Sequence, residues 1–445
     1  MKQFSTILIL LALIALVGCT SGTSTSTVDR SLAKLSAFSF AKNDSMPGLA
    51  AAVFSIEERI DTGLVWNKDS ILFGTDLTRV VPRFTFASTP DAAYLKMGDS
   101  LYALTGYDTL DFTITPIYLT IRSADKTNTK VYEIRAAVHL ADPDLYTWEQ
   151  LTDGIYPQDD SEQRVVELGD DFLMICSNGF ALRTFLSKDG KTWTEQASPT
   201  GLPTGTKVRQ IISDGNTLYY GQGNTIYTST DAITWTTNSV SYPVVTMLLY
   251  WNERVWALVD NSGYELAYMD GSDLSLSGLK PKGDFPVSDF AAVTFQSASL
   301  RKRAMIIGGF ADNGKSLNTR WNLEYSSHIE ENKGYRLQEF SIDRPSFTSL
   351  TGISVIYYNQ QLMLFGGVDD QMSYFGREIL ISIDEGLNWT QADSAKNQLP
   401  EVYQARQKQS AIVRNNTIYL FGGQDSEHTY SDVYKGRLNS IDWNN

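Results

Sequence analysis

Alternation of apolar and polar residues is the clearest pattern in the first third of the chain. Residues 117–121 (Ile-Tyr-Leu-Thr-Ile) and 132–136 (Tyr-Glu-Ile-Arg-Ala) both follow a period of two, which predicts half-buried strands. The polar stretch 123–128 between them predicts a turn. We find no apolar stripe with helical spacing here, and therefore expect residues 30–143 to form a small antiparallel β-sandwich. Its general shape should be Ig-like, although the Cys…Trp…Cys signature is absent.

The remainder of the chain, residues 144–445, repeats itself. Hydrophobic strand patterns recur in six units that start near Val165, Val208, Val244, Phe290, Ile353 and Ser410. Successive starts lie 36 to 63 residues apart, a range that brackets the roughly 40–50 residues of a propeller blade. The sequence therefore predicts an all-β chain with a β-propeller of six blades, or of seven if the long fourth unit contains two. A run of hairpins in a sandwich or a β-helix is the alternative.

A short motif ending in tryptophan recurs within these units. The copies are Asp144–Trp148, Asp189–Trp193, Asp231–Trp235 and the looser Ser382–Trp389. Asp and Ser side chains at such spacing hydrogen-bond nearby backbone amides, glycine supplies a positive φ, and tryptophan packs between sheets. The motif resembles the Asp box of sialidase-type propellers, which lies on the rim of that fold. The resemblance implies a fold and no activity.

Three hydrophobic strand patterns in the C-terminal half end in a pair of glycines. The pairs are Gly308-Gly309, Gly366-Gly367 and Gly422-Gly423. They resemble the kelch repeat, in which the second strand of each blade ends in Gly-Gly, and so imply a propeller again.

The two ends of the repeating region are each incomplete. Residues 149–152 stand alone before the first unit, and the last unit stops directly after its turn. We expect residues 149–152 to pair with the third strand of the last blade, near Tyr434 to Arg437. Such pairing closes the ring and removes exposed sheet edges.

The N-terminus has the pattern of an export signal. Lys2 is followed by an apolar run over residues 7–17, too short for a transmembrane helix. Leu16-Val17-Gly18-Cys19 resembles the lipobox of bacterial lipoproteins, which implies cleavage before Cys19 and a diacylglycerol on its thiol. Residues 1–18 are then the signal peptide and 19–29 a flexible tether. An ordinary secretory signal that happens to contain a cysteine is the alternative.

Composition limits the classes of partner and ligand that we expect this chain to bind. The 445 residues carry a net charge of −14, which argues against nucleic acid and against electrostatic attachment to anionic lipid. Cys176 is the second of the two cysteines and lies in an apolar run, so we expect a buried thiol and no intrachain disulfide. His139, His328 and His428 lie in separate segments, and we expect neither a metal site nor a cofactor.

Taken together, these features resemble uncharacterised Gram-negative surface lipoproteins with an Ig-like front domain and a kelch or Asp-box propeller. Thr20 after the cysteine resembles the outer-membrane sorting pattern. The resemblance implies a lipid-anchored binding or scaffold protein of the outer membrane, with a glycan or an envelope protein as partner. A carbohydrate hydrolase, sialidase-like or another glycosidase, is the alternative. We do not expect an enzyme, because the first unit, Gln163-Arg164-Val165-Val166, lacks the Arg-Ile-Pro motif of sialidases.

Propeller ligands usually bind where loops lead into the innermost strands. Arg164, Arg209 and Arg406 precede or begin strands of three different units. If they converge, three guanidiniums would form an anion or sugar site with Tyr403 as a stacking surface. Alternatively, each arginine caps its own loop or pairs with a nearby acid.

Overall fold

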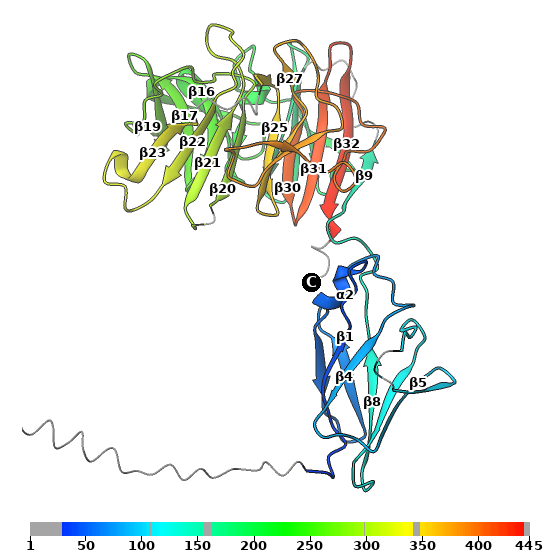
Figure 1. Cartoon of the computed structure of the whole chain (residues 1–445). Helices are drawn as coiled ribbons and strands as arrows, with labels where there is room; N and C mark the ends of the chain where they lie inside the picture. Colours follow the sequence, from blue (N-terminus) through cyan, green and yellow to red (C-terminus); the bar gives the residue numbers. More distant parts are fainter. Residues whose placement is uncertain are drawn as a thin grey trace, which may run out of the picture. The chain divides into compact units, whose positions relative to one another are not determined.

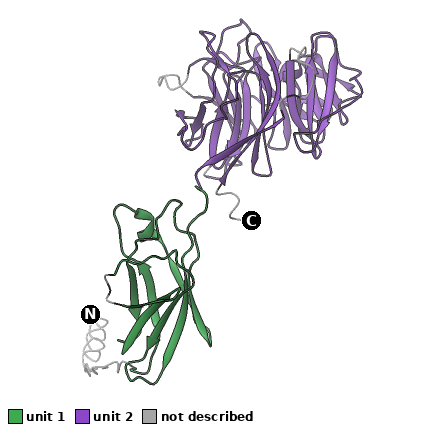
Figure 2. Ribbon diagram, turned by 90° about the vertical axis from the view of Figure 1, so that its right-hand side faces the viewer, with its two compact units in different colours: residues 1–142 green, residues 143–445 purple. Residues whose placement is uncertain are grey.

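The structure is a computed structural model (Figure 1). It describes residues 29–104, 106, 108–152, 154, 162–297, 299–340 and 348–439. The chain divides into two compact units, residues up to Asp142 and residues from Pro143 onward (Figure 2). Cys19 and the leader lie outside the described residues. Within the described residues, no helix is both long and apolar enough to cross a membrane.

The N-terminal unit is built from two sheets. One has six strands in the order β2-β3-β8-β7-β5-β6, and the other pairs β1 with β4. The strands are β1 (Leu35–Phe40), β2 (Phe54–Glu57), β3 (Thr62–Asn67), β4 (Pro82–Phe86), β5 (Ala92–Met97), β6 (Ser100–Ala103), β7 (Ile117–Arg122) and β8 (Thr129–Arg135). A five-residue helix, α2 (Pro47–Ala51), is the only helix assigned in this unit's described residues. The expectation of a purely antiparallel unit was wrong in one place, because β3 and β8 run parallel.

The alternating segments recognised in the sequence form the centre of the larger sheet. Strands β7 and β8 pair antiparallel, with Ile117 opposite Ile134. Ile117, Leu119 and Ile121 are almost fully buried, because alternate side chains of a strand face the same side of the sheet. Phenylalanine rings fill the space beneath; Phe38, for example, lies 4.7 Å from Phe54 between ring centroids.

The second unit is a β-propeller. Its first sheet comprises β10 (Glu162–Leu168), β11 (Asp171–Ser177), β12 (Leu182–Ser187) and β13 (Thr194–Glu195). The next comprises β14 (Ile212–Ser213), β15 (Leu218–Ser229), β16 (Thr236–Trp251), β17 (Arg254–Asp260), β18 (Tyr264–Asp270) and β19 (Asp273–Leu276). The sixteen-residue β16 pairs first with β15 and then with β17. It therefore joins the second and third blades into one sheet.

Three further sheets complete the ring. The fourth blade contains β20 (Ala291–Gln296), β21 (Lys302–Ile307), β22 (Arg320–Tyr325) and β23 (Tyr335–Glu339). The fifth contains β25 (Ser354–Tyr358), β26 (Gln361–Phe365), β28 (Ile379–Ser382) and β29 (Thr390–Gln391), beside the short pair β24 (Leu350–Thr351) and β27 (Val368–Asp369). The sixth contains β30 (Ser410–Arg414), β31 (Thr417–Gln424), β32 (Thr429–Leu438) and β9 (Tyr146–Thr152). Two 3-10 turns are η1 (Val208–Gln210) and η2 (Asn332–Gly334). In the described residues the propeller thus has six blades, and the long fourth unit hides no seventh.

The seam of the ring joins the two ends of the propeller, as predicted. Strand β9 lies beside β32 (Figure 1) and pairs with it antiparallel, with Gln150 opposite Tyr434 and Thr147 opposite Arg437. One expectation nearby was wrong: Asp144–Trp148 is no turn of the repeated kind. Tyr146 begins β9, and the Trp148 ring lies against Gly436, where a side chain would collide with it. The last three residues of this segment, Tyr146–Trp148, belong to the strand.

The other three tryptophan motifs share one hydrogen-bonded turn. In the first, Ser187 Oγ accepts the amide of Gly190, Asp189 accepts the amide of Thr192, and Trp193 Nε1 donates to the Gly190 carbonyl. The turns at Ser229–Trp235 and Ser382–Trp389 repeat these bonds. The residue in the glycine position has a positive φ in all three copies. The tryptophans of these turns pack against the neighbouring blade. Each turn therefore also contributes to the packing between blades.

Candidate functional site

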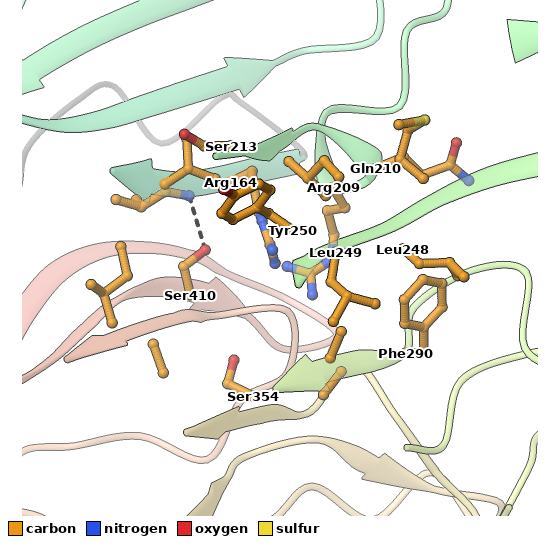
Figure 3. Close-up of a pocket in the computed structure, with 18 of the residues that line it drawn as sticks. Arg164, Arg209, Gln210, Ser213, Leu248, Leu249, Tyr250, Phe290, Ser354 and Ser410 are labelled. Atoms are coloured by element: carbon orange, nitrogen blue, oxygen red, sulfur yellow. Dashed lines mark hydrogen bonds between the residues drawn. The ribbon is translucent and has the colours of Figure 1, made fainter. Parts of the chain in front are cut away.

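The centre of the propeller encloses a cavity of about 600 Å³ (Figure 3). Residues of the innermost strand of each of the six blades line it: β10, β14, β16, β20, β25 and β30. Four of the predicted unit starts, Val165, Phe290, Ile353 and Ser410, are among the lining residues. A volume of this size fits a small molecule. The repeating pattern of the sequence therefore included residues of the cavity wall, although it was used only to predict the blades.

Arg164 is on β10 and extends into this cavity (Figure 3). Its guanidinium has no hydrogen bond or ion pair with any described residue, and its buried Nε has no partner. Burial, together with the neighbouring charge of Arg209, lowers the pKa of Arg164 to about 10. The side chain therefore still carries its positive charge at neutral pH. An unpaired charge in such a position is costly.

Arg209 reaches the same cavity from η1. Its Nη1 donates to the carbonyl oxygen of Lys408 at 2.6 Å, and its Nε forms an ion pair with Asp289 Oδ1 at 3.4 Å. The ammonium of Lys408 lies 3.6 Å from the second oxygen of Asp289. Burial lowers the pKa of Arg209, and the charges of Asp289 and Glu162 partly oppose that effect. Asp289 is therefore shared between two cations, and a surplus of positive charge remains.

The other carboxylates of the cavity wall are mostly engaged. Glu167 accepts a hydrogen bond from Arg414 Nε at 2.7 Å. Asp214 accepts the backbone amides of Asn216 and Thr217 in a turn. Among the described residues of the wall, Glu162 is the carboxylate to which the structure assigns no such partner.

Two sequence-predicted site residues, Tyr403 and Arg406, do not reach the cavity. Arg406 is 1% exposed, and its guanidinium forms a two-pronged ion pair with Asp432 and donates to the carbonyl of Gly422. Tyr403 is 3% exposed; its hydroxyl donates to the amide oxygen of Gln409, and its ring lies 4.4 Å from the Arg406 guanidinium carbon. Their assignment to a ligand site was wrong. The alternative, an arginine paired with a nearby acid, describes Arg406.

The surroundings of Arg406 stabilise its positive charge. Burial alone would lower the pKa of Arg406, but the hydrogen bonds and charge of Asp432 raise it above its usual value. The site therefore keeps two of the three proposed arginines, Arg164 and Arg209, which lie near each other in Figure 3.

Sequence reasoning missed the residues that shape the rest of the cavity. Leu249, Tyr250 and Phe290 form an apolar part of the wall (Figure 3). Asp289 was visible as a residue preceding an innermost strand, but its partners Arg209 and Lys408 lie 80 and 119 residues away along the chain. A signal that could have found it is its place directly before the fourth unit start. Within the described residues, no group of three His, Cys, Asp or Glu side chains could hold a metal ion.

Comparison with known proteins first gives the class of protein. The chain consists of an N-terminal domain and a β-propeller domain, and both match models of one family whose domains are described as of unknown function. Residues 142–445 match the DUF6242 beta propeller domain, and residues 23–136 match the N-terminal domain of unknown function DUF6242. The chain therefore belongs to the DUF6242 family.

Comparison with individual proteins gives less information than the family models do. No curated protein matches the chain. Among solved structures, that of YjhT is similar to 64% of this chain and to 96% of its own length, with 14% sequence identity and a TM-score of 0.47.

Proposed function

We propose that this protein is a lipid-anchored binding protein of the outer membrane whose propeller takes a small ligand into its central cavity. The observation that carries the proposal is the charge of Arg164, which lies in the cavity of about 600 Å³ without a partner among the described residues. Propeller interiors can be filled by side chains. A cavity that keeps both open volume and an uncompensated charge favours a ligand over a purely structural role.

The N-terminal sequence supports the anchored part of the proposal. The apolar run 7–17 ends at Gly18-Cys19, and Ser/Thr-rich residues follow. A lipid on Cys19 and a flexible tether would hold both units outside the cytoplasm. We further assign the N-terminal unit to the Ig-like type, and the tryptophan turns and glycine pairs to the Asp-box and kelch repeats, on the sequence resemblance given above.

A carbohydrate hydrolase is the second candidate, because Glu162 and Asp289 line the same cavity as the two arginines. Most glycosidases require two carboxyl groups free to act on one bond. Asp289 is held by Arg209 and Lys408, which leaves Glu162 alone. We therefore favour binding over catalysis.

The anchor is tested by labelling cells with a clickable fatty acid. The wild-type chain should carry the label in the outer-membrane fraction, and Cys19→Ala should lose it because the acylated thiol is gone. Equal labelling of both chains would contradict lipidation at Cys19.

The binding role is tested with a glycan array and a thermal-shift screen on the chain from residue 20 onward. We expect at least one ligand to raise the melting temperature of the propeller. Arg164→Gln should abolish that shift, whereas Arg336→Gln, on the exposed face of the outer strand β23, should leave it intact. A ligand that binds both variants equally would place the binding site outside the cavity.

A further inference from the structure

We propose that the ligand carries a carboxylate, which Arg164 and Arg209 bind together inside the central cavity. The inference rests on the proposed binding function and names its chemical class. It concerns the part of the cavity wall where the two guanidiniums approach each other (Figure 3).

The balance of charge around the two arginines is the first argument. Asp289 is shared by Arg209 and Lys408, so one negative charge already faces two positive ones. Arg164 adds a third cation, and its strongest charged neighbour is Arg209, another cation. A protein with a net charge of −14 has many acids to place beside Arg164, yet none of the described ones forms an ion pair with it. Glu162 on the same wall adds a second negative charge, which acts on Arg209. Three positive charges against two negative ones leave a surplus that one monoanion would compensate.

The geometry of the donors is the second argument. A guanidinium presents a planar fork of N–H groups that matches the two oxygens of a carboxylate. The Arg164 guanidinium extends into the cavity (Figure 3) and forms no hydrogen bond or ion pair with a described residue. An oxyanion in the cavity would satisfy donors that the protein leaves open, and buried donors are rarely left so.

The remaining wall indicates what is attached to the carboxylate. Leu249, Tyr250 and Phe290 offer apolar surface, while two of the four serine hydroxyls of the wall already donate within the protein. Ser213 Oγ and Ser354 Oγ donate to the carbonyls of Glu167 and Gln409. The ligand body is therefore a ring or short chain with an apolar face, of a size that a cavity of about 600 Å³ admits.

The test compares matched probes by isothermal titration with the chain from residue 20 onward. The pairs are glucuronate against glucose and benzoate against benzamide, with glucose 6-phosphate as the phosphate analogue. We expect at least one carboxylate to bind about tenfold or more tighter than its neutral counterpart, and tighter than the phosphate. Such a difference is what one charge-assisted contact of about 1.4 kcal/mol provides.

Arg164→Gln is the decisive variant. It should lose tenfold or more in affinity for the carboxylate, while Arg336→Gln should bind as the wild type does. Without ligand, Arg164→Gln should melt at the wild-type temperature or above it, because the change removes repulsion between two cations. That measurement separates a lost contact from a lost fold.

Three outcomes would overturn the inference. Equal affinity for the neutral probes, or a preference for the phosphate, removes the carboxylate but leaves the cavity as a binding site. No binding of any carboxylate removes the inference as well. The proposed function fails separately, if the array ligands bind Arg164→Gln and the wild type alike.

Discussion

The two units of this chain are both built from β-sheets, but they divide their hydrophobic cores differently. The N-terminal unit has one buried cluster, in which Phe38, Leu95 and Ile134 belong together. The described part of the propeller has six separate clusters. Several lie between neighbouring blades, such as the one that joins Met305 of β21 to Leu364 of β26. The first unit is stabilised by packing two sheets, and the second by packing a series of sheets in a ring.

The units also differ in how their sheets end. The six-stranded sheet of the N-terminal unit ends at β2 and β6, which each have one paired neighbour. Each propeller sheet also has edge strands, but the ring of sheets is closed, because β9 from the start of the propeller completes the blade made by β30, β31 and β32. Residues nearly three hundred positions apart thus share a sheet. A ring depends on its seam, and an open sheet has no equivalent point of failure.

Removal of the seam strand should have the largest effect. A chain that stops at residue 425 lacks β32, so that β9 and β31 lose their partner and Arg406 loses Asp432. We expect loss of the cooperative thermal transition of the propeller in differential scanning calorimetry. The transition of the N-terminal unit should remain and serves as the internal control. A truncated chain with both transitions at wild-type temperatures would show that the seam does not hold the ring.

Loss of the buried arginine comes next. Arg406→Ala leaves the carboxylate of Asp432 buried without its cation, and removing one member of such a pair typically costs about 3–5 kcal/mol. Urea unfolding should show this decrease in the propeller transition alone. Arg336→Ala should stay within about 0.5 kcal/mol of the wild type, since it is an exposed position.

The same pair offers a sharper control. The double variant Arg406→Met with Asp432→Leu removes both charges and keeps apolar volume, so it should be less destabilised than Arg406→Ala. If the double variant were the worse of the two, the burial of an unpaired charge would not be the cause.

Alkaline pH should have the smallest effect. The two units should differ in how much their free energy of unfolding falls as pH rises. Burial raises the pKa of Tyr132 in the N-terminal unit to about 12, and it raises the pKa of four tyrosines in the propeller to the same value: Tyr146, Tyr219, Tyr264 and Tyr430. Unfolded tyrosines lose their proton near pH 10. Between pH about 10 and about 12 the folded state therefore binds more protons, and the free energy of unfolding falls as pH rises.

The propeller should lose more stability over this interval than the N-terminal unit. Urea unfolding at pH 9 and pH 10.5 measures the two transitions side by side. Tyr146→Phe should reduce the slope for the propeller, because phenylalanine does not titrate. An equal slope for both units would mean that these tyrosines do not set the alkaline limit.

Local patterns in the sequence were enough to predict most of the fold. Strand alternation gave β7 and β8, and Ser-x-Asp spacing gave the turns at Ser187 and Ser229, because both depend on residues close together in the chain. The unpaired segment 149–152 predicted the seam, since exposed edges of a ring must be paired. Asp144–Trp148 misled for the same reason: the local letters fit a turn, but pairing with β32 makes it part of a strand.

The candidate site was only half predictable. Arg164 lies within β10 and Arg406 shortly before β30, and the sequence by itself determined that both carry charge near the start of an innermost strand. Tertiary structure alone decided their roles. Asp432, on the third strand of the same blade, holds Arg406 inside the sixth blade, whereas no described acid pairs with Arg164, which extends into the cavity. Whether a charged side chain meets a compensating partner depends on how distant segments pack, and the residues next to it in the chain do not determine that packing.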